Sequence, residues 1–316
     1  MRLLTLLAFL VAFVCVSAQK ILTPNPVIGI VSQVQSKYDP QYPNRQYIAA
    51  SYVKWIESAG GRVVPVPMNL PKDQHRKLIS QLNGLLLPGG GTYISEEVKQ
   101  MLSYITELHE QGDYFPVWGT CMGFQWMSMF YANQYNNFLD AYNSYNVSYA
   151  LEWTPNARNT TFYNYLPFEI RNILSNPDMN VTLNNHHWGV SPEKFQKYLA
   201  NQFNLISINN DEDGKTFVST MQHKLYPVFG VQWHPEKNNF ELGMDPGQQM
   251  HEAINHSLEA ILASQYASNF FVHQCRFNGH KFASWEELEA KLIYNYAPVR
   301  SGVDFVQKYY FDTFVF

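Results

Sequence analysis

Residues 116–125 read PVWGTCMGFQ, and they predict a strand, a sharp turn and a helix in direct succession. The apolar run 115–118 is typical of a buried strand, and residues 124–131 have the pattern of a helix. Between them, Gly119-Thr120-Cys121-Met122-Gly123 leaves almost no room for a loop. This Gly-x-Cys-x-Gly pattern matches a nucleophile elbow, in which a strained turn lifts a reactive side chain above the end of a sheet.

The elbow explains why a cysteine stands between two glycines. The backbone of the strand passes close to the backbone of the helix, so the flanking positions Gly119 and Gly123 must be small. The N-terminus of the following helix points at the sulfur and favours the thiolate. The backbone N–H of Met122 is then free to bind an oxyanion. The alternative is a buried structural cysteine beside packing glycines.

The elements around the elbow indicate an α/β fold. Short apolar strands are expected at 27–31, 62–66, 84–87 and 115–118, and helices at 49–58, 75–82, 95–111 and 124–131. Strands that alternate with helices predict a mainly parallel sheet covered on both faces. Later strands are expected at 203–208, 216–220 and 228–233, and helices at 192–199, 248–266 or on to 272, and after 281. Region 132–185 is expected to hold short antiparallel strands or long loops. We find no repeat and no linker, so residues 19–316 are predicted to be a single domain.

A second polar motif follows the strand at 228–233. It reads Trp233-His234-Pro235-Glu236, and the proline stops the strand directly after the histidine. Glu236 is near enough in sequence for its carboxylate to hold the imidazole in one tautomer and to stabilise its charged form. His234 and Glu236 are therefore the predicted acid/base and its orienting group. A histidine at a strand end is otherwise more often structural.

Two further clusters are candidates for the site. Pro88-Gly89-Gly90-Gly91 follows another strand, and Gly90 or Gly91 could supply a second oxyanion N–H; the alternative is a flexible turn. In Asn185-His186-His187-Trp188, no cysteine or carboxylate stands at zinc-ligand spacing. We therefore expect a pocket role for one histidine, and no metal or cofactor.

Composition and the first residues bear on location. The 316 residues are 46% hydrophobic with a net charge of −4 and no basic run, so no nucleic-acid partner is expected. Residues 1–18 have the basic start, apolar run and small-residue end of a secretory signal peptide, and no later segment is expected to cross a membrane. Four N-glycosylation motifs suit that route, at Asn146, Asn159, Asn180 and Asn255.

Because disulfides form along the secretory route, the pairing of the two later cysteines has to be considered. Cys15 would leave with the signal peptide, so Cys121 and Cys275 could form a disulfide. The glycines that flank Cys121 argue against this, because a disulfide does not need them. Cys275 is expected to be an ordinary buried thiol.

Three segments together resemble the class I glutamine amidotransferase-like superfamily, namely LPGGG, GTCMGFQ and GVQWHPE. Longer stretches resemble the gamma-glutamyl hydrolase (folylpolyglutamate hydrolase) family, namely PVWGTCMGF, QWHPEK and YIAASYVKWIESAGGRVVPV. The resemblance implies a flavodoxin-like three-layer α/β/α sandwich. It also implies a thiol-dependent omega peptidase that cleaves gamma-glutamyl bonds of folate and antifolate polyglutamates. A lysosomal, vacuolar or secreted location and a homodimer are further implications.

The resemblance also assigns roles to residues. It places Cys121 as nucleophile, His234 as acid/base, Glu236 as third member, and Met122 with Gly90 or Gly91 in the oxyanion hole. His186 resembles the pocket histidine of the family, although His187 competes for that position. A substrate with several carboxylates calls for cations, for which Arg45 and Lys54 are the candidates near the first strand-to-helix connection. The alternatives are a glutaminase or amidotransferase acting on free glutamine, and a non-catalytic secreted glycoprotein.

Overall fold

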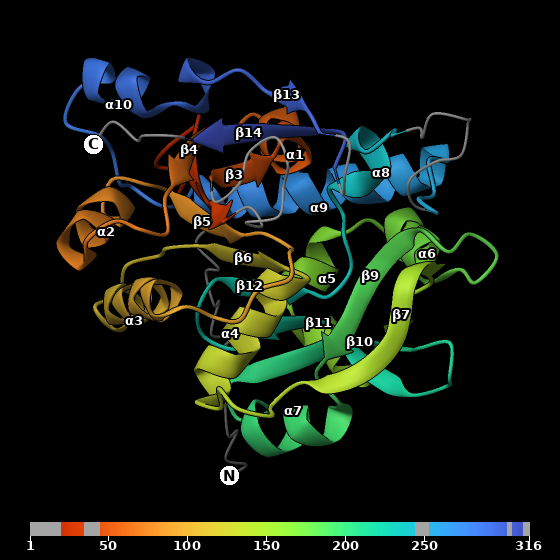
Figure 1. Ribbon diagram of the computed structural model, residues 1–316. Helices are drawn as coiled ribbons and strands as arrows, with labels where there is room; N and C mark the ends of the chain where they lie inside the picture. The colour runs from red at the N-terminus through yellow and green to blue at the C-terminus, as the bar shows by residue number, and fades with distance from the viewer. Residues whose placement is uncertain (1–19, 35–44, 244–252, 302–304, 312–316) are drawn as a thin grey trace, which may run out of the picture.

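The computed structural model describes residues 20–34, 45–243, 253–301 and 305–311. The expected signal peptide, residues 1–18, lies outside these ranges. An eight-stranded sheet forms the centre, with the order β4-β1-β5-β6-β12-β11-β10-β8 (Figure 1). Its strands are β4 (Arg62–Val66), β1 (Val27–Val31), β5 (Gly84–Leu87), β6 (Val117–Thr120), β12 (Val228–Val231), β11 (Thr216–His223), β10 (Phe203–Asn210) and β8 (Glu152–Trp153). The first five pair in parallel and the last three add antiparallel, so the prediction of a mainly parallel sheet is confirmed.

Helices cover both faces of this sheet. One face packs on α2 (Lys72–Ile79), α3 (Glu96–Glu110), α4 (Met122–Ala132), α7 (Pro192–Tyr198) and α10 (Trp285–Lys291). The other packs on α1 (Ala50–Ser58), α5 (Thr161–Tyr165), α6 (Phe168–Ser175) and α9 (Leu258–Cys275). Strand residues alternate between the two cores: Leu85 and Leu87 face the first and Leu86 faces the second. Burial on both faces explains why these strands are continuously apolar, and it confirms the three-layer prediction.

Region 132–185 is more structured than expected. β7 (Asp140–Tyr149) pairs antiparallel with β9 (Thr182–Gly189), and together they form a ribbon separate from the central sheet. Between these strands lie β8, the 3-10 turn η1 (Pro155–Asn159) and the short helices α5 and α6. The expected antiparallel strands are therefore present, but the two short helices were not predicted. Helices of five and eight residues carry little periodicity, and their apolar side chains are recognisable only once α9 packs against them.

The long C-terminal helix begins later than expected. Residues 248–252 lie outside the described ranges, and residues 253–256 are not helical. α9 starts after Ser257, whose hydroxyl caps the helix by accepting the N–H of Ala260 at 3.2 Å. Four elements form a small sheet beside α1: β2 (Gln33–Val34), β3 (Gln46–Ala49), β14 (Gln307–Phe311) and β13 (Val299–Arg300). The remaining pieces are α8 (Lys237–Phe240) and the 3-10 turn η2 (Ile293–Asn295).

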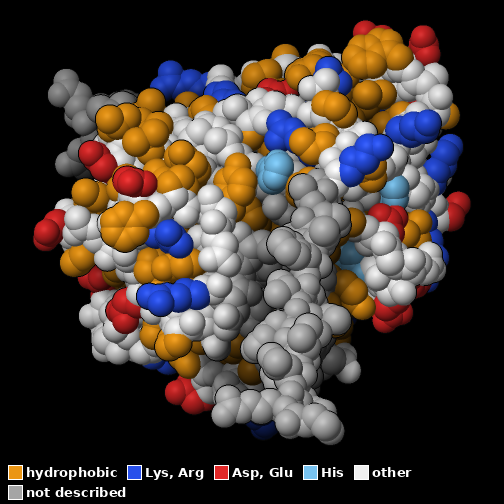
Figure 2. All heavy atoms as spheres, turned by 180° about the vertical axis from the view of Figure 1, so that it is seen from behind, with side chains coloured by type: hydrophobic (Ala, Val, Ile, Leu, Met, Phe, Trp, Pro, Cys, Tyr) orange, Lys and Arg blue, Asp and Glu red, His pale blue; other side chains and the backbone are white. Residues whose placement is uncertain are grey.

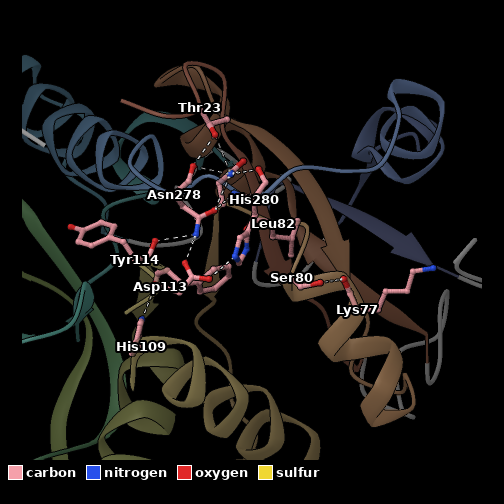
Figure 3. A network of polar contacts seen from close by, with 11 residues as sticks. Thr23, Lys77, Ser80, Leu82, His109, Asp113, Tyr114, Asn278 and His280 are labelled. Carbon is pink, nitrogen blue, oxygen red and sulfur yellow. Dashed lines mark hydrogen bonds and ion pairs between the residues drawn. The ribbon is translucent and has the colours of Figure 1, made fainter. Parts of the chain in front are cut away.

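A polar network, here called the basal clamp, closes the amino ends of the parallel strands (Figure 3). It consists of Asn83, Asp113, Asn278 and His280. Asn83 accepts the N–H of Val27 at 2.8 Å and donates to the His280 carbonyl at 2.8 Å. Asn278 donates to the Asp113 carboxylate at 3.1 Å, and His280 lies 2.6 Å from it. The clamp thus ties the segment after α9 to the starts of β1, β5 and β6.

The described surface has no single dominant character on the face seen in Figure 2. Acidic and basic side chains are interspersed there with hydrophobic ones. Within the described ranges, no helix combines the length and the apolar character needed to cross a bilayer.

Candidate active site

Cys121 occupies a strained backbone position between β6 and α4. Its φ is 50° and its ψ is −104°, a combination that residues with a Cβ rarely adopt. The Cys121 N–H donates to the Val231 carbonyl at 2.8 Å, and the Gly123 N–H donates to the Pro88 carbonyl at 3.0 Å. These two bonds anchor the turn to the neighbouring strands β12 and β5. The predicted nucleophile elbow is therefore present in the described geometry.

The flanking glycines are required by close backbone contacts. A Cβ on Gly123 would lie 2.1 Å from the carbonyl oxygen of Leu87. A Cβ on Gly119 would lie 2.7 Å from the carbonyl carbon of Gly123. Neither neighbour is the movable end of a side chain, so a methyl group at either position would displace the backbone. This is the close strand-to-helix approach that the sequence predicted.

His234 and Glu236 lie directly behind the cysteine. Nδ1 of His234 is 2.7 Å from Oε1 of Glu236, and both side chains are buried. The thiol of Cys121 makes a side-chain hydrogen bond to the same imidazole, which leaves Nε2 as the nitrogen that faces it. Burial alone would lower the pKa of His234, but the negative charges of Glu236 and then Cys121 outweigh it and raise this pKa. The three residues are thus arranged as nucleophile, base and orienting carboxylate.

Backbone N–H groups surround the space above the sulfur. Those of Gly89 and Thr92 are occupied, by the Tyr52 hydroxyl at 2.7 Å and the Met122 sulfur at 3.1 Å. Those of Gly90, Gly91 and Met122 make no hydrogen bond to any residue in the described ranges. Gly90 and Gly91 are exposed, and they line the same pocket as Met122. These are the N–H groups that the sequence proposed for an oxyanion hole.

A pocket of about 410 Å³ opens onto Cys121. The ribbon of β7 and β9, which stands to one side of α4 in Figure 1, supplies one of its walls. Seven of the wall side chains are large and apolar or aromatic: Tyr93, Met129, Tyr135, Phe138, Leu139, Tyr145 and Trp188. No Lys, Arg, Asp or Glu is among the described residues that line it.

The two adjacent histidines have different environments in this pocket. His186 is buried, with Nε2 3.2 Å from Oδ1 of Asn184, and burial followed by the charge of His234 lowers its pKa to about 3. It therefore lines the pocket as a neutral imidazole. His187 is more exposed and stacks on Tyr145, with ring centroids 4.9 Å apart. The structure favours His186 over His187 as the residue closer to the catalytic pair.

The two basic residues expected near the substrate, Lys54 and Arg45, are not among the described residues that line the pocket. Lys54 donates to Gln307 of β14 at 2.7 Å, so its substrate contact stays a prediction. Lys54 was a candidate because it lies near the first strand-to-helix connection, and the structure places it on α1. The role of Arg45 stays a prediction as well.

Sequence reasoning missed the pocket side chains on the ribbon. Tyr145 and Trp188 come from β7 and β9, which were not predicted as a pair. Gln125 donates to the Trp188 carbonyl at 2.6 Å and so fastens α4 to the ribbon. The run of aromatic residues and asparagines in 132–185 was the available signal, but it does not indicate a pairing register.

The two cysteines in the described ranges do not form a disulfide. Cys121 and Cys275 are both free and buried, and Cys275 packs against the Cα of Gly84. Within the described ranges, no group of three or more His, Cys, Asp and Glu side chains is arranged to hold a metal ion.

Comparison with known proteins provides independent evidence of the family to which the chain is related. Residues 26–236 match the family described as Peptidase C26. The chain is 39% identical to gamma-glutamyl hydrolase B of Dictyostelium discoideum, over 86% of this chain and 78% of that protein. It is 37% identical to the gamma-glutamyl hydrolase of Homo sapiens, over 91% and 90%. The glutaminase domain of Trypanosoma brucei CTPS aligns with a TM-score of 0.47 at 12% identity, over 83% and 96%.

Proposed function

The chain belongs to the peptidase C26 family, and on that premise we propose that Cys121, His234 and Glu236 together hydrolyse gamma-glutamyl bonds. Membership makes the chain a cysteine-type hydrolase. The observation that supports the residue assignment most is the hydrogen-bonded series from Cys121 through His234 to Glu236, at the open end of the pocket. Hydrolysis of free glutamine is the less favoured alternative, and a non-catalytic role would leave this strained elbow without a purpose.

The proposed reaction begins with attack of the Cys121 thiolate on the side-chain carbonyl of a gamma-linked glutamate. The N–H groups of Met122 and of Gly90 or Gly91 hold the tetrahedral oxyanion, at roughly 3 kcal/mol per donor in comparable sites. His234 gives its proton to the departing amino group, and a thioester remains on Cys121. Water activated by His234 then releases the acid and restores the thiol. Glu236 holds the imidazole in the required tautomer throughout.

Folate polyglutamates are the proposed substrate class. The aromatic lining of the pocket suits a flat ring system, because stacking on tyrosine and tryptophan stabilises such groups. The neutral His186 would then act as a hydrogen-bonding group toward the substrate rather than as a charge. The absence of cations from the described lining implies that the glutamate tail extends beyond this pocket.

Replacement of the nucleophile is the decisive experiment. We expect Cys121→Ala to abolish release of glutamate from pteroyl-gamma-polyglutamate while the thermal unfolding midpoint stays near that of the wild type. Cys275→Ala is the matched control, since Cys275 is a buried thiol remote from the pocket, and it should keep activity. Chromatography of the products, with free glutamine as a parallel substrate, measures both. Activity retained by Cys121→Ala, or wild-type turnover of glutamine equal to that of the polyglutamate, would contradict the proposal.

Passage through the secretory pathway, to a lysosome, a vacuole or the outside of the cell, is a further proposal. It is supported by the composition of residues 1–18 and by the four glycosylation motifs. The side chains of Asn159 and Asn180 are exposed. Asn255 instead donates its amide to the Met179 carbonyl at 2.6 Å and accepts the Ser257 N–H at 2.9 Å. A glycan on that nitrogen would replace one of the two hydrogens that it donates to the carbonyls of Met179 and Asn180 in the folded chain.

We therefore expect glycans at Asn159 and Asn180 and an unmodified Asn255. Asn146 is intermediate, because it is half-buried and its side-chain oxygen accepts the N–H of Ala253 at 2.5 Å. Mass spectrometry of protein secreted by eukaryotic cells, after enzymatic glycan release in heavy-oxygen water, measures occupancy at each motif. A fully occupied Asn255 beside an empty Asn159 would reverse the ranking. The homodimer stays a prediction of the family resemblance.

A further inference from the structure

We propose that Tyr52 is a positioning residue whose hydroxyl couples the carboxylate of the catalytic triad to the loop that supplies the oxyanion hole. The inference rests on the proposed roles of Cys121, His234 and Glu236. Tyr52 lies on α1, is fully buried and is not among the residues that line the pocket. It therefore acts through other groups rather than on the substrate.

The first contact of Tyr52 is with the glycine-rich loop. Its hydroxyl oxygen accepts the N–H of Gly89 at 2.7 Å. The loop is crowded at this point: a Cβ on Gly89 would lie 2.6 Å from Cε1 of His234, 2.8 Å from the Tyr52 oxygen and 3.3 Å from Cβ of Cys121. Since the Gly89 N–H is held by the tyrosine, the next N–H along the chain is that of Gly90, a residue that lines the pocket.

The second group near Tyr52 is the carboxylate of Glu236. Glu236 is fully buried, and its Oε1 is used by His234. Its Oε2 is also buried, and it has no well-formed hydrogen bond to any described residue. The Tyr52 hydroxyl lies close to the triad, since a Cβ on Gly89 would contact both this hydroxyl and Cε1 of His234. Burial, and then the negative charge of Glu236, raise the pKa of Tyr52 well above its usual value. The hydroxyl is therefore protonated, and because it already accepts from Gly89, its own proton is available to Oε2.

In this arrangement the Tyr52 hydroxyl would make two hydrogen bonds at once, one as donor and one as acceptor. Donation to Oε2 would leave Oε1 fixed on Nδ1 of His234, and acceptance from Gly89 fixes the loop that carries Gly90. Phenylalanine at position 52 would leave a buried donor and a buried acceptor without partners at once. We expect the loop and the carboxylate to shift, which would misplace both the oxyanion donors and the imidazole.

Tyr52→Phe tests the proposal. We expect kcat to fall ~10- to 100-fold with KM changed by no more than about 3-fold, since sub-ångström misplacement of reacting groups acts mainly on the chemical step. The rate of Cys121 alkylation by iodoacetamide, followed against pH, should change its profile as well. Tyr114→Phe is the matched control, because it removes a tyrosine hydroxyl that donates to Gln274 at 2.5 Å, far from the pocket. It should leave both readouts at the wild-type level.

A double-mutant cycle separates coupling from simple destabilisation. If Tyr52 acts through Glu236, Tyr52→Phe should cost much less activity in a Glu236→Gln background than in the wild type. Fully additive losses, or an unchanged kcat and alkylation profile in Tyr52→Phe, would overturn the proposal. If the phenylalanine variant does not fold, 3-fluorotyrosine at position 52 keeps the shape, and an unaltered pH profile with it would also overturn the proposal. The alkylation readout needs no substrate, so failure of the proposed substrate class would be recognised separately.

Discussion

Two histidine–carboxylate pairs stand at opposite ends of the parallel strands, and they differ in the partner of the second ring nitrogen. At the carboxyl ends, Nδ1 of His234 is 2.7 Å from Glu236. At the amino ends, Nε2 of His280 is 2.6 Å from Asp113 (Figure 3). In both pairs a carboxylate raises the pKa of an imidazole against the opposing effect of burial.

The second nitrogen distinguishes a catalytic pair from a structural one. In His234 it faces the Cys121 thiol beside an open pocket, so it can give and take a proton. In His280 it is Nδ1, which lies 2.9 Å from the Leu82 carbonyl oxygen. Both partners of His280 are hydrogen-bond acceptors, and an imidazole can donate to two acceptors only when it is doubly protonated. The pair at the amino ends is therefore a static ion pair within the basal clamp.

Exchanging each histidine for asparagine should separate the two roles most strongly. We expect His234→Asn to lower kcat by ~100- to 10,000-fold, the usual contribution of a general acid–base. His280→Asn should keep kcat within about 2-fold of the wild type while lowering the free energy of unfolding by about 1.5–3 kcal/mol, as expected for a hydrogen bond to a charged group. Steady-state kinetics and urea unfolding measure the two effects. A large activity loss in folded His280→Asn would show that the clamp reaches the active site.

The contact of the proposed catalytic pair was predictable from the sequence, and the contacts of the clamp were not. His234 and Glu236 are two residues apart and follow a strand, so local chain geometry alone brings them together. Asp113 and His280 are separated by 167 positions, and neither stands in a motif. Their contact depends on where α9 ends relative to the start of β6, which is fixed only by the packing of the whole sandwich.

The fold also divides into elements that the local sequence predicts and elements that depend on the packing of distant segments. β1, β4 and β5 match the predicted residues at both ends, because strands buried on two faces are continuously apolar and short. Antiparallel strands were expected in 132–185, but the pairing of β7 with β9 was not predicted, because one side faces the pocket and the register shifts twice along it. Asn146 adopts a left-handed conformation within β7, which also interrupts the alternation on which strand prediction relies. The pocket walls therefore had to come from the structure.

The smallest expected effect is a pH dependence of stability that belongs to the clamp. The groups that face His280 are the Asp113 carboxylate, the carbonyls of Leu82 and Ile79, and the ring of Phe115. Burial opposes the charged imidazole, but the contacts with Asp113 and the two carbonyls raise the pKa of His280 above 6.5. The stabilisation is therefore fully present below pH 6.5, where both folded and unfolded chains carry the proton, and it is lost as the pH rises through the folded pKa.

Asp113→Asn isolates this contribution. We expect the wild type to exceed the variant by about 1–2 kcal/mol in free energy of unfolding at pH 5.5, and by less at pH 8, because the imidazolium that Asp113 stabilises is then being lost. Urea unfolding of both proteins across this range gives the difference, in which titration elsewhere in the chain cancels. A difference that grew toward pH 8 would show that His280 is neutral in the fold and that the clamp is not an ion pair.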